Sequence, residues 1–186
     1  MKIQTVFLDR DGVLNEDKED KDEYLRSEEE IIVYPFVPEA IRKLTEKGIR
    51  IFIISNQSGI NRRFFDEKTV EKMFQKVITY TESTGGKITD YYYCPHLPEE
   101  ECSCRKPKTG MLQKAVKEYQ LSLKESIMIG DALTDYEMAN NAGIPFILVR
   151  TGKGKRTEEK LKEKGAKFMV VDNLESAVSF LVKDIP

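Results

Sequence analysis

The amino-acid sequence predicts an α/β fold in which helices cover both faces of a parallel β-sheet. Short apolar runs of β-forming residues alternate along the chain with segments of helical periodicity, an order typical of parallel sheets. Polar residues also stand at the ends of several predicted strands, where open parallel sheets bind ligands. The 186 residues suit one substantial core and no long linker divides them, so we expect a single domain over residues 1–186.

The predicted elements follow one another along most of the chain. Strands are expected at residues 3–8, 50–54, 88–93, 126–129, 146–149 and 167–170. Helices are expected at residues 38–47, 66–83, 109–119, 133–141 and 174–181. Pro38 opens the first helix and Gly48 closes it, while Asp66 and Thr109 can cap the next two helices and Gly143 stops the fourth.

Composition narrows the possible functions. The 30 basic and 32 acidic residues nearly cancel and are interspersed, which argues against a nucleic-acid partner. No apolar run approaches the ~20 residues that cross a bilayer, and the N-terminus is a poor secretory signal. Three cysteines cannot form a disulfide framework. We therefore expect a cytoplasmic monomer that acts on a small metabolite, without a membrane partner.

The first motif, DRDG, follows the first predicted strand. Asp9 and Asp11 are expected to point the same way because strand side chains alternate with a period of two. One carboxylate can attack phosphorus, while the other protonates the leaving oxygen and then activates water. Gly12 lets the backbone turn sharply. The alternative is a solvated turn at the strand end.

The GDALTD motif supplies further carboxylates at another strand end. Magnesium prefers oxygen ligands, and the side chains of Asp9 and Asp131 with the main-chain carbonyl of Asp11 make a suitable set. Asp135 can orient Asp131 or a metal-bound water. The alternative is that Asp131 caps the following helix, and both roles are compatible.

The SNQSGI segment follows the second predicted strand. The hydroxyl group of Ser55 can donate a hydrogen bond to a phosphoryl oxygen, and Asn56 can hold the departing alcohol. The alternative is a polar turn that only connects a strand to a helix.

A loop over residues 94–104 contains every cysteine and the only histidine. One nitrogen and three sulfur atoms make a closed tetrahedral site of the structural zinc type. The expected ligands are Cys94, His96, Cys102 and Cys104. A redox pair or inert thiols would not explain the histidine.

Two cations follow this loop directly. Lys106 suits the charge on a phosphoryl group in transfer, and Arg105 can bind a second anion of the substrate in bidentate fashion. A loop held by zinc would fix both side chains in place. The alternative is an exposed basic pair.

Together these motifs resemble the haloacid-dehalogenase (HAD) phosphatase superfamily, in the same order and over most of the chain. The resemblance implies a Rossmann-like fold with a minimal cap, and hydrolysis through an aspartyl-phosphate. It also implies a role for each of five residues: Asp9 as nucleophile, Asp11 as general acid and base, Ser55 as phosphoryl-binding hydroxyl, Lys106 as stabilising cation and Asp131 as magnesium ligand.

The segment CPH…CxCRKPKTGM is similar to the zinc-loop subgroup, which contains heptose 1,7-bisphosphate phosphatases and histidinol phosphatases. SNQSGINR and VRTGKGK favour the heptose enzymes. The expected reaction is removal of the C7 phosphate, with histidinol phosphate as the alternative substrate. The expected substrate-binding residues are Asn15, Ser55, Asn56, Gln57, Arg62, Arg105 and Lys106. A non-catalytic, zinc-stabilised binding protein is a further alternative, but it would not need the complete catalytic set.

The sequence departs from this subgroup at two places. Residues 15–30 form an acidic, irregular insertion where the subgroup has a short flap containing His and Gly. We expect a mobile flap over about residues 15–35, whose sugar contacts cannot be inferred from the subgroup. Ala132 stands where some heptose enzymes have a lysine beside the metal-binding aspartate.

Overall fold

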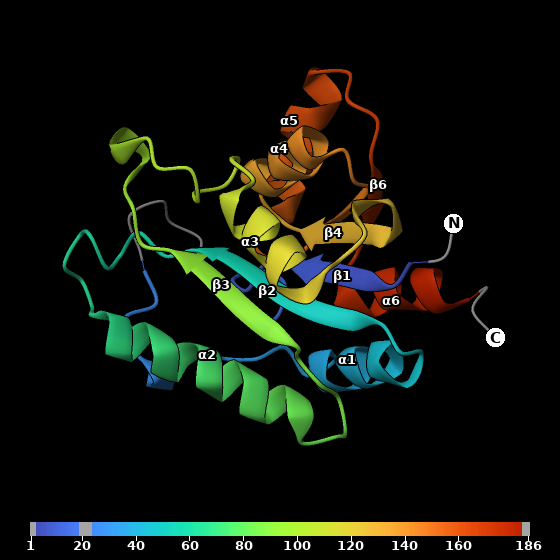
Figure 1. Ribbon diagram of the computed structural model, residues 1–186, viewed down its shortest axis with the longest axis horizontal. Helices are drawn as coiled ribbons and strands as arrows, with labels where there is room; N and C mark the ends of the chain where they lie inside the picture. The colour runs from blue at the N-terminus through green and yellow to red at the C-terminus, as the bar shows by residue number, and fades with distance from the viewer. Residues whose placement is uncertain (1–2, 19–23, 184–186) are drawn as a thin grey trace.

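The computed structural model describes residues 3–18 and 24–183, which form one parallel sheet between two layers of helices (Figure 1). The strands are β1 (Thr5–Leu8), β2 (Arg50–Asn56), β3 (Asp90–Cys94), β4 (Ser126–Gly130), β5 (Phe146–Val149) and β6 (Met169–Val171). The sheet order is β3-β2-β1-β4-β5-β6, with every neighbouring pair parallel. The predicted α/β class is therefore confirmed.

Six α-helices cover the sheet in the described part of the chain: α1 (Val37–Glu46), α2 (Glu67–Glu82), α3 (Gly110–Tyr119), α4 (Leu133–Ala142), α5 (Gly154–Glu163) and α6 (Leu174–Val182). Short 3₁₀ helices occur at Glu28–Glu30, Pro98–Glu100 and Leu123–Glu125. Helices α1, α2 and α6 pack on one face, and α3, α4 and α5 on the other (Figure 1). None of the described helices is long and apolar enough to cross a membrane.

Local signals in the sequence explain where several helices begin and end. The side chain of Asp66 accepts a hydrogen bond from the Thr69 amide at 2.8 Å, which confirms it as the cap of α2. Gly143 ends α4 with a φ of +68°, a conformation that glycine adopts without strain. Thr109 stands at the N-cap position of α3, but its side chain makes no capping hydrogen bond.

The predicted strands and helices are present, with their ends shifted by a few residues. Helix α5 was not predicted, because its sequence GKRTEEKLKE contains only one large apolar residue, Leu161. Its buried positions include Thr157 and Glu158, so the inward face does not show the apolar periodicity of a typical helix.

The strand register brings the predicted functional residues together. Leu8, the last residue of β1, pairs with Ile53 of β2 and Ile129 of β4. The loops after these three central strands therefore leave the sheet at the same edge. Strands β1 to β3 extend the sheet in one direction and β4 to β6 in the other, so the strand order reverses between β1 and β4. Open α/β sheets bind ligands at such a point.

The segment after β1 lies against the body of the fold where it is described. Asn15 forms a bridge to Val33, and Leu25 and Ile31 are buried. Lys76 of α2 donates a hydrogen bond to the Glu28 carbonyl at 2.6 Å. Residues 19–23 of the expected mobile flap lie outside the described residues, and the flap's mobility stays a prediction.

Candidate active site

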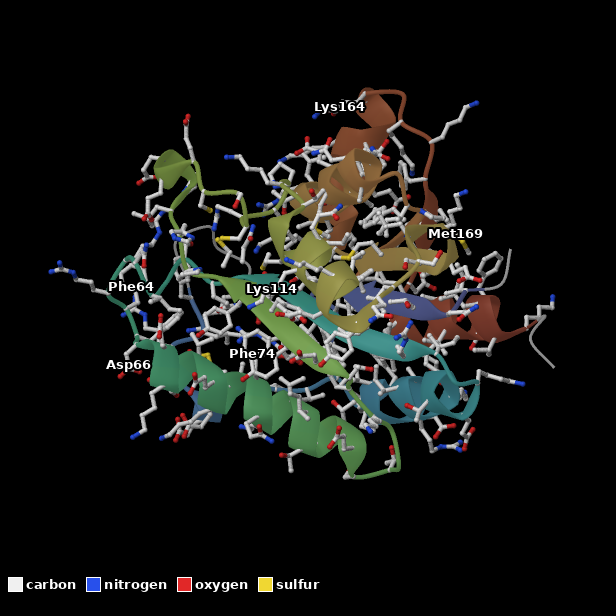
Figure 2. All side chains as sticks on the ribbon, in the orientation of Figure 1. Phe64, Asp66, Phe74, Lys114, Lys164 and Met169 are labelled. Carbon is white, nitrogen blue, oxygen red and sulfur yellow. The ribbon has the colours of Figure 1, made fainter. Side chains whose placement is uncertain are left out.

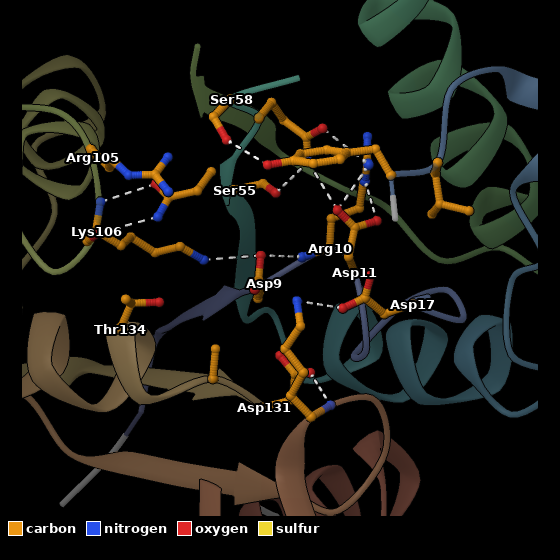
Figure 3. Close-up of a pocket in the computed structure, with 16 residues that line it drawn as sticks. Asp9, Arg10, Asp11, Asp17, Ser55, Ser58, Arg105, Lys106, Asp131 and Thr134 are labelled. Carbon is orange, nitrogen blue, oxygen red and sulfur yellow. Dashed lines mark hydrogen bonds and ion pairs between the residues drawn. The ribbon is translucent and has the colours of Figure 1, made fainter. Parts of the chain in front are cut away.

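A cavity of about 210 Å³ opens at the carboxyl ends of β1, β2 and β4 (Figure 3). Among the described residues, eight charged side chains line it: Asp9, Asp11, Asp17, Asp131, Arg10, Arg105, Lys106 and Lys153. Four of these are acidic and four basic, so within the described lining the formal charges cancel. Such a cavity can hold a cation and an anion next to each other.

Lys106 reaches the centre of the cavity from the loop that follows the Cys/His segment. Its Nζ lies 2.9 Å from Asp9 Oδ1 and 2.6 Å from Asp135 Oδ1, and it donates a hydrogen bond to the Ile54 carbonyl at 2.8 Å. Burial alone would lower the pKa of Lys106, but the two carboxylates outweigh burial and raise it. The buried ammonium therefore stays charged beside Asp9.

Asp9 follows β1 directly and is held from two directions. Its Oδ1 accepts a hydrogen bond from the Arg10 amide at 2.7 Å, in addition to its contact with Lys106. Burial raises the pKa of the Asp9 carboxyl, Lys106 lowers it, and the nearby carboxylates of Asp135 and Asp11 raise it further, so that it lies above its usual range. Without a further cation, the negative charge on Asp9 is poorly compensated.

Asp11 is held by a clamp that the sequence did not suggest. Nε and Nη2 of Arg10 each lie 2.9 Å from one oxygen of its carboxylate, and the amides of Asn15 and Gln57 each donate to it at 2.9 Å. Burial would raise the pKa of Asp11, but Arg10 and the two amides lower it. The Arg10 guanidinium is buried and lies 4.8 Å from the Phe74 ring centroid.

Ser55 and Asn56, the two polar residues at the end of β2, have different hydrogen-bond partners. Ser55 is buried, lines the cavity, and accepts a hydrogen bond from the Gln57 amide at 2.9 Å. Asn56 also lines the cavity, but its amide accepts from the Lys106 amide at 3.0 Å and donates to the Lys106 carbonyl at 3.1 Å. Asn56 thus positions Lys106, and its expected contact with the departing alcohol stays a prediction.

Two expected substrate contacts lie outside the cavity. Asn15 is completely buried, and its amide nitrogen donates to Asp11 and to the Glu16 carbonyl. It does not line the cavity and contacts it through Asp11, so a direct contact of Asn15 with substrate stays a prediction. Arg62 is exposed in the turn after β2, where its amide bonds the Ser58 carbonyl, and it does not line the cavity.

Three buried carboxylates form a cluster that fits a divalent cation. One oxygen each of Asp9, Asp131 and Asp135 can be chosen so that all three lie within 4.8 Å of one another. Burial, followed by repulsion from Asp9 and Asp135, raises the pKa of Asp131 well above its usual range. Crowded, buried carboxylates of this kind suit Mg²⁺, which binds hard oxygen ligands. The carboxylate of Asp11 is not in this cluster, and the role expected for its main-chain carbonyl stays a prediction.

Asp131 and Asp135, at the start of α4, have different hydrogen-bond partners. The Ala132 amide donates to Asp135 Oδ2 at 3.0 Å, so Asp135 caps the helix and Asp131 does not. Asp131 instead accepts a hydrogen bond from the Lys153 amide at 2.7 Å. Asp135 also contacts Lys106, and its expected role of orienting Asp131 or a metal-bound water stays a prediction.

The Cys/His loop brings its four expected ligand atoms together. Cys104 Sγ lies 3.0 Å from Cys94 Sγ, 3.2 Å from His96 Nδ1 and 3.4 Å from Cys102 Sγ. All four ligand atoms lie within 4.8 Å of one another, close enough to bind one zinc ion. Burial would raise the pKa of Cys102, but hydrogen bonds, that from the Arg105 amide first among them, lower it to about 7, which favours the thiolate that binds metal.

The same loop positions Arg105 at the cavity. Its amide donates to Cys102 Sγ at 3.4 Å and its Nη1 donates to the His96 carbonyl at 3.0 Å. The backbone and the guanidinium of Arg105 are therefore both tied to residues of the Cys/His cluster, as the sequence predicted for a loop held by zinc.

Lys153 and Asp17 are cavity residues that sequence reasoning missed. The ammonium of Lys153 lies 2.7 Å from Asp17 Oδ2, and Figure 3 shows Asp17 on the opposite side of Asp9 from Arg105. The available signal was the TGKG sequence, which stood out in VRTGKGK but had no assigned role.

Comparisons with known proteins agree with this geometry. A family model for HAD-hydrolase-like proteins matches residues 103–177. The D-glycero-β-D-manno-heptose-1,7-bisphosphate 7-phosphatase of Pseudomonas putida is 39% identical over 85% of this chain and 89% of its own. The Pseudomonas aeruginosa enzyme of the same name is 36% identical over 98% of this chain and 100% of its own.

Among solved structures, the D,D-heptose 1,7-bisphosphate phosphatase of B. bronchiseptica, complexed with magnesium and phosphate, superposes with a TM-score of 0.89. It is 33% identical, and the match covers 99% of both chains. The chain therefore belongs to the HAD-like phosphatases, in the family of the D-glycero-β-D-manno-heptose-1,7-bisphosphate 7-phosphatases.

Proposed function

We propose that the enzyme removes the C7 phosphate from D-glycero-D-manno-heptose 1,7-bisphosphate. Arg105 provides the observation that carries this proposal. Among the described residues, the other three cations that line the cavity each pair with a carboxylate, whereas Arg105 forms no ion pair and is held by the His96 carbonyl. An arginine at the cavity wall that forms no ion pair with the protein can bind a second anion on the substrate.

The reaction proceeds in two displacements at phosphorus. A carboxylate oxygen of Asp9 attacks the C7 phosphoryl group, the bond from phosphorus to the sugar oxygen breaks, and Asp11 gives that oxygen a proton. Water then attacks the aspartyl-phosphate and loses a proton to Asp11, which releases inorganic phosphate and restores Asp9. Lys106 and Ser55 bind the phosphoryl oxygens in both steps.

The clamp around Asp11 suits the second displacement. Arg10, Asn15 and Gln57 hold its carboxylate ionised, the form that accepts a proton from water. The approach of an anionic substrate raises the proton affinity of a neighbouring carboxylate, which favours the protonated form needed in the first step. Asp9 and Asp131 would hold magnesium, which would supply positive charge near the phosphoryl oxygens.

A kinetic comparison tests the substrate. Histidinol phosphate has one phosphate and a cationic amine, which Arg105 would repel. Charge-assisted contacts are worth about 1.5–3 kcal/mol, so we expect kcat/KM for the bisphosphate to be higher by about ten- to a hundredfold. Arg105→Ala should remove this advantage and leave a simple phosphate monoester less affected.

Arg62→Ala is a matched control, because Arg62 is exposed and does not line the cavity. It should leave the preference for the bisphosphate unchanged. If histidinol phosphate is the better substrate of the parent enzyme, the heptose assignment is wrong while the two-displacement mechanism stands.

We also infer that residues 1–186 act as one phosphatase domain. Two hydrophobic clusters pack on opposite faces of the same sheet, which supports a single folding unit. The expectations of a monomer and of a cytoplasmic location stay predictions, which light scattering and cell fractionation would test.

A further inference from the structure

Lys153 lies in a loop that is fastened to the active site by its backbone. The loop connects β5 to α5 and has the sequence Thr151-Gly-Lys-Gly154. The Lys153 amide donates to Asp131 Oδ2 at 2.7 Å, and the Thr151 hydroxyl donates to the Gly12 carbonyl at 2.6 Å. These two bonds join the loop to the ends of β4 and β1, which carry the reacting carboxylates.

The glycines of this loop allow an unusually close approach. A Cβ atom on Gly152 would collide with the Asp131 carboxylate and with the Gly12 backbone. A Cβ atom on Gly154 would collide with the Val149 carbonyl. The backbone of Lys153 is therefore fixed beside the cavity, and only its side chain is free to change position.

The side chain of Lys153 is held much less firmly than that of Lys106. Lys106 is 1% exposed and contacts Asp9, Asp135 and the Ile54 carbonyl. The Lys153 side chain is 45% exposed, and among the described residues its ammonium makes one ion pair, with Asp17 Oδ2 at 2.7 Å. Because the Lys153 side chain is half exposed and has one carboxylate partner among the described residues, an anion that enters the cavity can replace that partner.

We propose that Lys153 binds the reacting phosphoryl group, exchanging the Asp17 carboxylate for a phosphoryl oxygen when substrate enters. Asp17 belongs to the flap and competes with phosphate for the same ammonium. This inference deepens the proposed function by adding a phosphate contact to the same site, next to Asp17, which Figure 3 shows on the side of Asp9 away from Arg105. It predicts that loss of the Lys153 charge weakens phosphate binding, whereas loss of the Asp17 charge strengthens it.

The test measures the inhibition constant of inorganic phosphate, using the full chain with magnesium and a simple phosphate monoester as substrate. Lys153→Met keeps the backbone amide that binds Asp131 and should weaken phosphate binding by about tenfold. Asp17→Asn removes the competing charge and should tighten phosphate binding by about two- to fivefold, the range of a weak ion pair. In the Lys153→Met background, Asp17→Asn should have no further effect.

Two further variants complete the experiment. Lys153→Arg keeps the charge and should retain phosphate affinity, which separates loss of charge from loss of folding. Lys155→Met, at the exposed start of α5, is the matched control and should bind phosphate as the parent does.

The inference is overturned if Asp17→Asn weakens phosphate binding in parallel with Lys153→Met, because the ion pair then serves only to hold the flap. An unchanged inhibition constant in folded Lys153→Met overturns it as well. Inorganic phosphate is the probe, so the result does not depend on which phosphate ester is the natural substrate. Failure of the heptose assignment would therefore leave this test intact.

Discussion

On one side of the cavity, Arg105 and Lys106 follow a loop whose four ligand atoms crowd within reach of one metal ion. On the other side, the flap that carries Asp17 rests on weaker contacts. Tyr24 stacks edge-on against Phe64 with a centroid distance of 5.1 Å, and the Arg26 guanidinium lies 4.7 Å from the Phe64 ring centroid. Arg105 and Lys106 are thus on the rigid side, whereas Lys153, the further phosphate contact that we propose, pairs with Asp17 on the flap side.

This difference separates the fixed groups of the site from a segment that we expect to move. A displacement at phosphorus needs charges fixed to within a fraction of an ångström, which a metal-bound loop provides. Binding and release need a segment that can move, and we expect the flap, which is held in part by an ion pair and aromatic contacts, to be that segment. Disrupting the rigid side should therefore lower kcat, and disrupting the flap side should mainly raise KM.

The largest effect on turnover is expected for a substitution of Asp9, the attacking residue. Asp9→Asn keeps the shape of the side chain but removes the attacking oxygen, so turnover should fall by about 10⁴-fold or more. Asp172→Asn, an exposed carboxylate distant from the cavity, is the control. Steady-state kinetics would measure both, and near-normal turnover of Asp9→Asn would exclude covalent catalysis by Asp9.

The next effect concerns the rigid side. Cys102→Ser should lower the zinc content of the purified protein and reduce the free energy of unfolding by about 3 kcal/mol, because one ligand of the site is lost. Activity should fall with it, since Arg105 bonds both Cys102 and His96.

Ser103→Ala changes an exposed residue between two of the ligands and should retain zinc and activity. Metal analysis and thermal unfolding would compare the two variants. Parent protein that is purified with reduced thiols and contains no zinc would contradict the assignment of this site.

A smaller effect is expected on the flap side. Phe64 lies at the periphery near the start of α2 (Figure 2) and contacts both Tyr24 and Arg26 of the flap. Phe64→Ala should raise KM by about three- to tenfold, the range of a lost aromatic contact, and should change kcat little.

Phe180→Ala removes another exposed phenylalanine, on α6 and outside the cavity, and should leave KM unchanged. A drop in kcat with unchanged KM for Phe64→Ala would contradict the division between the two sides.

The rigid side was predictable from the sequence and the flap side was not. Cys94, His96, Cys102 and Cys104 lie close together along the chain, so their spacing alone indicated a metal site. The central strands were predicted because their apolar runs are short and well bounded. Both signals depend only on residues that are close together in the sequence, so they can be recognised without knowledge of tertiary packing.

The missed residues depend on contacts between distant segments. Arg10 binds Asp11 but owes its burial to Met73 and Phe74 of α2. Lys153 reaches the cavity only because glycines allow its loop to pack on Gly12. No spacing rule in the sequence predicts such contacts, and the same applies to the polar helix α5 that follows this loop.

The smallest expected effect concerns the support of that loop. Arg150, just before Thr151, binds Glu158 of α5 with its Nε 2.7 Å from Oε2, and Lys162 donates to the same carboxylate at 2.6 Å. Hydrogen bonds from Arg150, then from Lys162, lower the pKa of Glu158 to about 2 from an ordinary value of 4.5. A carboxylate with a depressed pKa in the folded state stabilises the fold above its unfolded pKa and loses this contribution as pH falls towards 2.

Glu158→Gln should therefore melt at a slightly lower temperature than the parent at pH 7, and the two melting temperatures should converge between about pH 4.5 and pH 2. Thermal unfolding across this range would measure the difference, with Glu159→Gln, an exposed neighbour on the same helix, as the control. A difference that grows as pH falls would show that the Arg150–Glu158 pair does not stabilise the base of the loop.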